Sequence, residues 1–201
     1  MAQKNTKDLI LDAALDLFSE KGFAATSIRE IAEKVGIRKS SIYNHFKSKE
    51  DIFETLFSIL GAKTIKGIFE NKELQEKINH PYDFLKIFAK LVKKFVDNLE
   101  EEKLLKVMLM EHNSEVVRRM MKEKFLEEDR EILIKIFKEM IEKGLIKPYD
   151  PLTLANEFIG TLIFIRIQHL LLSYETDDFS VIYNLIDRHI EFFWNAIKVE
   201  D

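Results

Sequence analysis

One stretch, residues 27–49, constrains the fold of this chain more than any other feature of its sequence. It predicts two short helices joined by a glycine turn. Ser27 is placed to cap the first helix, and Glu30 follows three residues later, where its side chain can reach back to the Ser27 amide. Gly36 stands where a left-handed residue ends a helix, and a second helix of about two turns should then end at Phe46. The first helix carries an apolar face at helical spacing: Ile28, Ile31, Ala32 and Val35.

The same stretch is basic, although the whole chain carries a net charge of −4. Residues 34–49 contain no acidic side chain and five basic ones: Lys34, Arg38, Lys39, Lys47 and Lys49. A short polar helix edged with cations, backed by Ile37, Ile42 and Phe46, suits the phosphate-lined major groove. A small helical hairpin with a solvated basic face that binds nothing is the alternative. The first 50 residues carry 9 basic and 7 acidic side chains, so nucleic acid is expected at the N-terminal module rather than at the acidic remainder.

Short sequence motifs lie within and just before this stretch, at residues 13–18, 21–23, 26–32, 35–37 and 42–50. As a set, over residues 6–56, they resemble the DNA-binding domain of the tetracycline-repressor (TetR) family. One position departs from that pattern, because Ser40 stands where the family often has glycine. The serine leaves the helix start less free to approach the DNA backbone, though its hydroxyl can itself bond a phosphate. The resemblance implies DNA binding and says little about a ligand.

The residues expected to face DNA follow from the pattern of the second helix. Ile42 and Phe46, four residues apart, must face the core, so the polar residues between and before them face outward. Ser48 and Asp51 can cap the next helix, whose N-terminus is an anion site that the resemblance places against a phosphate. The predicted DNA-binding residues are Ser27, Arg38, Lys39, Ser40, Ser41, Tyr43, Asn44, His45 and Lys49.

The scarcity of helix breakers, six glycines and three prolines in 201 residues, predicts an all-α protein of about nine helices. We expect an N-terminal three-helix helix-turn-helix domain over residues 1–50. A helix over residues 48–69, softened by Gly61 and Gly67, should link it to a larger helical ligand-binding and dimerisation domain over residues 51–201. Residues 70–80 are polar and are expected to form a domain linker. Pro81 should begin the next helix, and a long helix is expected over residues 114–143.

The last two helices, expected over residues 152–172 and 181–197, are apolar on nearly all sides. A helix that is hydrophobic all round needs cover on every side, which one small domain cannot easily provide. A partner surface is therefore implied. The TetR family pairs its last two helices with those of a second copy in a four-helix bundle, and a dimer doubles the length of DNA that is read. We therefore expect a homodimer that forms through the last two helices and binds double-stranded operator DNA.

No pattern in the sequence indicates catalysis, a metal site or a cofactor. There is no cysteine, the six glycines form no phosphate loop, and the five histidines lack metal-ligand spacing. The most apolar run, residues 158–172, is interrupted by Arg166, Gln168 and His169 and is too short to span a bilayer. The N-terminus is polar and lacks an apolar signal segment. We expect a cytoplasmic protein without membrane association that is not an enzyme.

Sixteen phenylalanines and a group of methionines indicate a soft, aromatic interior, which either fills the core or lines a pocket. The resemblance favours a pocket, because the larger domain of the family usually binds a small molecule between its helices. Such a pocket is apolar with a few placed polar groups. For Arg166, an ion pair with Asp187 or Glu191 is the alternative role. The candidate ligand-binding residues are Phe88, Met108, His112, Met121, Phe125, Phe158, Arg166 and His169.

Taken together, these features predict a one-component transcriptional regulator that acts as a repressor and binds a palindromic operator. An apolar or amphipathic ligand, such as a fatty-acyl compound or a hydrophobic drug, would release it from DNA. Two alternatives lack DNA binding. One is a helical carrier of apolar ligands, and the other is an adaptor whose apolar last helices recruit a different protein.

Overall fold

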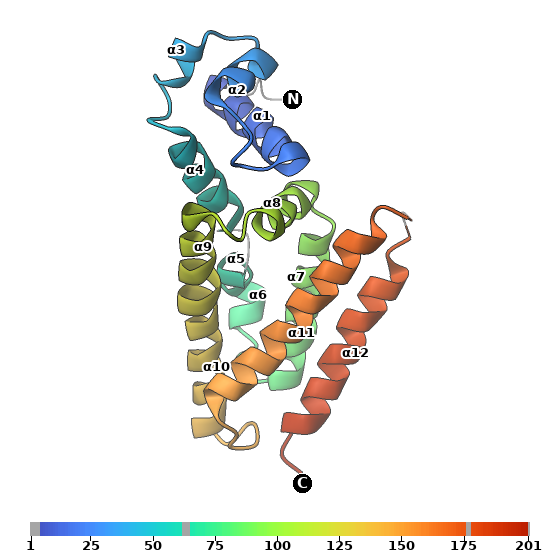
Figure 1. Ribbon diagram of the computed structural model, residues 1–201. Helices are drawn as coiled ribbons and strands as arrows, with labels where there is room; N and C mark the ends of the chain where they lie inside the picture. Colours follow the sequence, from blue (N-terminus) through green and yellow to red (C-terminus); the bar gives the residue numbers. More distant parts are fainter. Residues whose placement is uncertain (1–4, 62–64, 176–177, 201) are drawn as a thin grey trace. The chain divides into compact units, whose positions relative to one another are not determined.

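The computed structural model describes residues 5–61, 65–175 and 178–200 (Figure 1). Over these residues the chain forms twelve α-helices and one π-helix, and the all-α prediction is confirmed. The helices group into two compact units, the first made of residues 1–62 and 99–123 and the second of residues 63–98 and 124–201. Followed along the described residues, the chain passes between the units three times: between residues 61 and 65, at 98–99 and at 123–124.

The first unit is built around α1, which packs against α2, α4 and α8. Its apolar core is aromatic, because Phe18 and Phe53 are fully buried and the Phe23 ring lies 5.3 Å from each of them. Val107 on α8 is fully buried too, so residues 99–123 complete this core. The helices of the unit are α1 (Thr6–Lys21), α2 (Ile28–Val35), α3 (Lys39–Ile42), α4 (Lys49–Gly61), α8 (Leu99–Met110) and α9 (Glu115–Met121).

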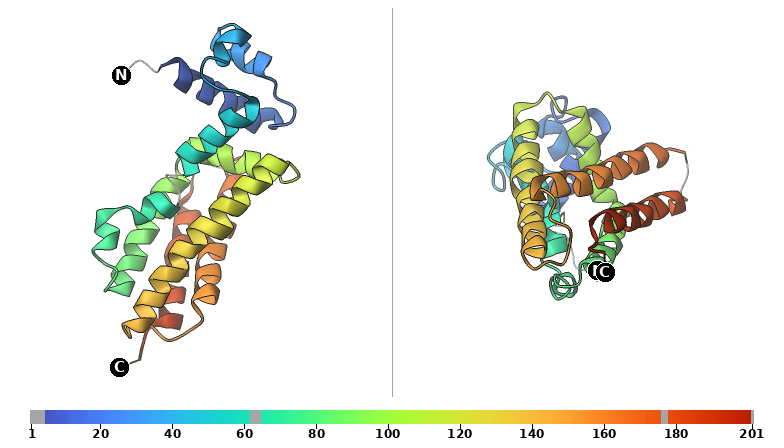
Figure 2. Two further views of the ribbon diagram at one scale, coloured as in Figure 1. Left: turned by 90° about the vertical axis from the view of Figure 1, so that its left-hand side faces the viewer. Right: turned by 90° about the horizontal axis from the view of Figure 1, so that it is seen from below.

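The second unit packs α10 against α11, and α12 against both α7 and α11. The two long helices α11 and α12 lie side by side (Figures 1 and 2). Asp150 caps α11 by accepting the Thr153 amide at 2.8 Å, with Pro151 as the first helical residue. The helices of the unit are α5 (Ile65–Phe69), α6 (Lys72–Gln75), α7 (Pro81–Val96), α10 (Arg130–Glu142), α11 (Pro151–Leu172) and α12 (Ser180–Ile197).

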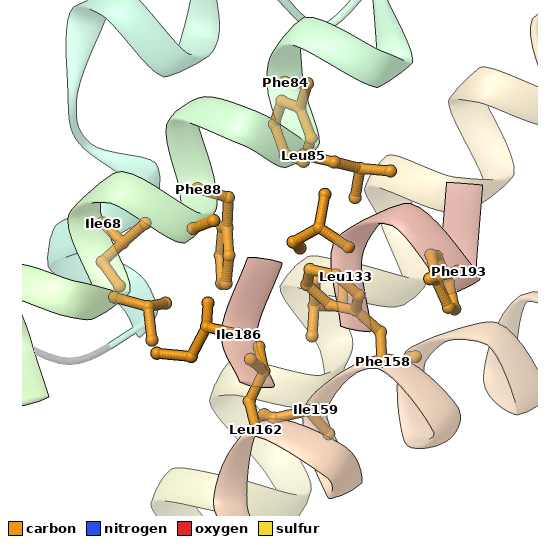
Figure 3. Packing of buried hydrophobic residues seen from close by; sticks show 14 of the residues in the cluster. Ile68, Phe84, Leu85, Phe88, Leu133, Phe158, Ile159, Leu162, Ile186 and Phe193 are labelled. Atoms are coloured by element: carbon orange, nitrogen blue, oxygen red, sulfur yellow. The ribbon is translucent and has the colours of Figure 1, made fainter. Parts of the chain in front are cut away.

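The core of the second unit is a contiguous aromatic and aliphatic cluster (Figure 3). Phe158 of α11 lies at its centre, with ring centroids 5.1 Å from Phe88 of α7 and 5.0 Å from Phe193 of α12. Leu133 of α10 and Ile186 of α12 are fully buried around it. Because all six α-helices of the unit contribute to one cluster, burial of this cluster holds the unit together.

The described residues form more helices than the sequence predicted, for two reasons. The long helix expected over residues 114–143 is divided into α9, a π-helix η1 (Lys122–Asp129) and α10, and η1 spans the division between the units. The segment expected to be a linker, residues 70–80, contains α6, whose Leu74 is fully buried and whose cap is Asn71. The segment is therefore anchored to the second core.

Two other expectations concern the link between the modules. The predicted helix over residues 48–69 appears as α4 and α5, and residues 62–64 between them lie outside the described residues. The division by contacts also differs from the expected boundary after residue 50, because α4 and α8 pack against α1, and α9 packs against α4 and α8. Among the described helices, none is both long and apolar enough to cross a bilayer.

Candidate nucleic-acid interface

The predicted capping box at the start of α2 is present. The Ser27 amide donates to Glu30 Oε2 at 2.8 Å, and the Glu30 amide donates to Ser27 Oγ at 3.3 Å. Lys21 binds the same carboxylate, and hydrogen bonds from Lys21 and Ser27 lower the pKa of Glu30 to about 2. The Ser27 hydroxyl, predicted to face DNA, also donates to Glu30 Oε2, so it would have to give up this bond to reach a phosphate.

The turn between α2 and α3 is closed by Gly36, which adopts a left-handed conformation with φ +78°. The Ile37 amide then donates to the Ala32 carbonyl at 3.0 Å, the pattern that ends a helix when a glycine follows it. The helix α3 itself is one turn, shorter than the two turns expected. Beyond Ile42 the amides of Asn44 and His45 bond to carbonyls three residues back, so the chain continues as turns.

Residues 38–47 present a polar and basic surface on a buried apolar back. Ile42 and Phe46 are buried, as predicted. Ser41 is half-buried and Tyr43 is half-exposed. The exposed polar residues of this surface are Arg38, Lys39, Ser40, Asn44, His45 and Lys47. The predicted DNA-facing residues other than Ser27 and Lys49 are therefore brought together on one short segment.

Lys49 does not join that surface. Its ammonium donates to the carbonyls of Phe23 at 2.6 Å, Thr26 at 2.8 Å and Ala24 at 3.3 Å. It also lies 4.4 Å from the centre of the Phe23 ring. A lysine has three N–H donors, and these three carbonyls use them all. The sequence could not reveal this, because the carbonyls belong to residues 23–26 and any backbone carbonyl can accept.

Lys34, another member of the basic run, is also paired within the protein. Its Nζ lies 3.0 Å from Asp16 Oδ2, and Lys103 Nζ lies 2.5 Å from Asp16 Oδ1. Burial on its own would raise the pKa of Asp16, but the hydrogen bonds and charges of Lys103 and Lys34 outweigh it, so the pKa lies below its usual value. Around α3, Arg38, Lys39 and Lys47 are exposed and take no part in this pairing.

The predicted ligand-binding residues are divided between the two units. Met108, His112 and Met121 belong to the first unit, where Met108 is buried and His112 is exposed. Phe125 lies in η1, and its side chain is outside the described residues. That these eight residues line one ligand site stays a prediction.

The candidates of the second unit are Phe88, Phe158, Arg166 and His169. Phe88 and Phe158 pack directly against each other in the core. His169 is buried, with its ring centroid 4.3 Å from that of Phe179. Arg166 donates to the Phe95 carbonyl at 3.0 Å and lies over the Phe95 ring at 4.6 Å.

The two acidic partners suggested for Arg166 are bound by other residues. Asp187 accepts from Lys93 at 2.5 Å, and Glu191 accepts from the Tyr82 hydroxyl at 2.6 Å. The bond to Glu191 also raises the pKa of Tyr82 above its usual value.

The outer faces of α11 and α12 enclose a groove of about 520 Å³. Phe164 and Phe192 stand on it with 62% and 75% of their surface exposed. His189 also lines it, with Nε2 3.1 Å from the Phe158 carbonyl oxygen, and burial lowers the pKa of this histidine although the bond to Phe158 opposes the shift. Large exposed aromatic side chains beside a groove are typical of an interaction surface.

Known proteins match the first part of this chain most strongly. Residues 10–56 match the family described as bacterial regulatory proteins, tetR family. The chain is 32% identical over 116 residues to the HTH-type transcriptional regulator AcrR of Shigella flexneri, which covers 57% of this chain and 52% of that protein. It is 52% identical over 48 residues to IcaR of Staphylococcus aureus, the HTH-type negative transcriptional regulator of the icaADBC biofilm operon. That match covers 24% of this chain and 26% of IcaR.

The matches therefore span about half and about a quarter of these two relatives. Over nearly the whole chain, the fold resembles that of SmeT, the repressor of a multidrug efflux pump of Stenotrophomonas maltophilia, in its complex with triclosan. The TM-score is 0.77 at 17% identity, over 98% of this chain and 93% of that one. At this identity the likeness concerns the fold.

The matched relatives are named as transcriptional regulators and not as enzymes, in agreement with the lack of catalytic motifs in the sequence. The match over residues 10–56 includes the capping box, the glycine turn and the exposed segment 38–47. Through these residues, the first part of the chain matches the tetR family of bacterial regulatory proteins.

Proposed function

We propose that this protein is a transcriptional repressor that binds a palindromic operator as a homodimer and is released by an apolar or amphipathic ligand. The observation that carries the proposal is the surface of residues 38–47, on which Arg38, Lys39 and Lys47 surround the exposed Asn44. The buried Ile42 and Phe46 hold this surface to the first core. Cations then bind phosphates, and the polar side chains between them reach base edges.

The proposed dimer forms through α11 and α12. Six large apolar side chains on these helices are at least 39% exposed in the single chain: Leu152, Ile163, Phe164, Leu171, Val181 and Phe192. A second copy offers the same surface, so an isologous pairing covers both at once. Two copies also present two segments 38–47, which matches an operator made of two inverted half-sites.

The proposed effector site lies in the second unit, beside Phe88 and Phe158. Two polar side chains on α11, Arg166 and His169, supply the placed polar groups that orient a ligand in an apolar pocket. The triclosan complex of SmeT supports an apolar aromatic compound as one class of effector. Native mass spectrometry of the freshly purified protein tests this part, since a retained small molecule adds a defined mass to each chain.

The experiment for the whole proposal is selection of DNA from a random-sequence library by the purified chain, together with its molar mass by light scattering. We expect enriched sequences with two inverted half-sites and twice the mass of one chain. Enrichment of no sequence would leave a carrier or an adaptor as the function. A monomer that selects single half-sites would contradict the proposed dimer and would support the proposed DNA binding.

A further inference from the structure

The backbone of Ala24, in the turn between α1 and α2, is held by opposite charges at its N–H and at its carbonyl. Its N–H donates to Glu111 Oε1 at 3.2 Å. Its carbonyl accepts from Lys49 Nζ at 3.3 Å. Glu111 follows α8, and Lys49 begins α4. One residue thus connects two helices that are far apart in the sequence.

Lys49 closes the base of the helix-turn-helix segment. The segment begins with the cap Ser27, and Thr26 directly before it gives its carbonyl to Lys49 at 2.8 Å. The segment ends at residue 48, and Lys49 follows it directly as the first residue of α4. The bond therefore fixes the distance between the two points at which α2 and α3 are joined to the rest of the unit. Because the ammonium also holds the Phe23 and Ala24 carbonyls, the whole turn is tied to the first residue of α4.

Glu111 also lies close to Gly22, the glycine that precedes this turn. A Cβ atom at position 22 would lie 2.4 Å from Glu111 Oε1, closer than any real contact, and Gly22 has φ +92°. The helix before Glu111 is α8. A separate contact holds it against α1, because Lys103 of α8 binds Asp16 of α1 at 2.5 Å. The chain on either side of residues 99–123 belongs to the second unit, so Glu111 lies on a segment that is joined to that unit at both ends of its sequence.

We propose that Lys49 and Glu111 are positioning residues for DNA binding that act through the Ala24 peptide and do not touch DNA. Lys49 holds the helix-turn-helix segment closed at its base, and Glu111 attaches that base to α8. This rests on the proposed function. A displacement of α8 then moves the Ala24 turn, and through Lys49 it moves the first turn of α4 and the segment that reads DNA.

The role of Lys49 is tested by the salt dependence of DNA binding. The probe is the DNA fragment that the wild type selects from a random library, measured by fluorescence anisotropy over a series of KCl concentrations. We expect Lys49→Met to weaken binding at least tenfold at every salt concentration without changing the slope of log K against log[KCl]. The matched control is Lys47→Met, which removes an exposed cation and should lower the slope by about 0.9. A fall of about 0.9 for Lys49→Met would show that Lys49 binds a phosphate and would overturn its positioning role.

The role of Glu111 is tested by hydrogen exchange of the Ala24 amide, followed by NMR, and by affinity for the same DNA. Glu111→Ala should speed this exchange at least tenfold and weaken DNA binding. Glu111→Gln keeps an accepting oxygen, so it should retain both properties. Glu115→Ala, an exposed glutamate four residues on, is the control and should change neither.

The two measurements separate the possible failures. Wild-type exchange and affinity in Glu111→Ala would overturn the proposal for Glu111, even if Lys49→Met does not fold. Rapid exchange with unchanged affinity would keep the bond and reject its role in DNA binding. A wild type that selects no DNA would defeat the proposed function and this role together, and the exchange result would still decide whether Glu111 holds the Ala24 amide.

Discussion

The ammonium of Lys103 lies 2.5 Å from a carboxylate oxygen of Asp16, a residue 87 positions earlier in the chain. The pair joins α8 to α1, and Lys34 binds the other oxygen of the same carboxylate. We expect Lys103→Met to lower the free energy of unfolding by about 0.5–1 kcal/mol, because the pair is only partly buried. Chemical denaturation of Lys103→Met, Asp16→Asn and the double variant measures the coupling, and additive effects would show that the pair contributes nothing.

The same pair has a pH dependence of known sign. The pKa of Asp16 lies below its usual value of 3.8 in the folded chain. Its contribution is therefore complete above pH 3.8 and is lost as the pH falls through the lower, folded pKa. Asp16→Asn should reduce the loss of stability below pH 4, measured by denaturant titrations at pH 7, 4 and 3. Parallel stability curves for the variant and the wild type would contradict this assignment.

The surface of residues 38–47 should separate affinity from sequence preference. We expect Lys39→Ala to weaken binding to all DNA alike and to lower the salt slope by about 0.9, since one phosphate contact is lost. Asn44→Ala should instead change the preferred sequence, at a cost of about 1–3 kcal/mol if its amide binds a base edge bidentately. Lys138→Ala, an exposed lysine on α10, is the control. Selection of DNA from a random library by each variant measures affinity and sequence preference. Unchanged DNA affinity in both Lys39→Ala and Asn44→Ala would show that another surface binds the DNA.

The exposed aromatic residues of α11 and α12 should decide the oligomeric state. Phe192→Asp places a charge on a side chain that is 75% exposed in the single chain, so it should not disturb the core. In the proposed dimer the same charge would be buried without a partner, and we expect monomers by light scattering. Tyr149→Asp changes another half-exposed aromatic residue outside α11 and α12 and should leave the dimer intact. A dimeric Phe192→Asp variant would place the interface on another surface.

Two glycines should respond to alanine with opposite signs. Gly36 has φ +78°, a conformation that costs an alanine about 1–2 kcal/mol, so Gly36→Ala should lower the free energy of unfolding. Gly160 lies inside α11, and a Cβ there would meet nothing within 4 Å. Gly160→Ala should therefore stabilise the protein by about 0.5–1 kcal/mol. Thermal unfolding followed by circular dichroism gives both signs, and equal shifts would contradict the backbone argument.

What the sequence predicted well depends on neighbours a few residues apart. The Ser27 and Glu30 pair and the left-handed Gly36 are local arrangements, and both are present. The burial of Ile42 and Phe46 followed from helical spacing alone. What the sequence could not predict depends on residues far apart. Glu111 receives an amide from a residue 87 positions away, and no spacing rule relates the two.

The features that the sequence did not reveal have the same origin. Leu74 stands in a polar stretch, and only the three-dimensional core shows that it is buried. Lys49 looked like a phosphate ligand because its charge is visible in the sequence, whereas the carbonyls that hold it belong to every residue type. The ligand candidates were chosen by side-chain chemistry, which cannot show that Met108 and Phe158 belong to different units.

The insertion of residues 99–123 into the first unit has a consequence for engineering this protein. A DNA-binding fragment made of residues 1–62 alone would lack α8 and α9. The surface of α1 that α8 covers would then be exposed to water. Grafting the DNA specificity of one relative onto another therefore requires replacement of two separate gene segments, joined at three places. A chimera with a single junction would combine an α1 and an α8 that were never selected to fit each other.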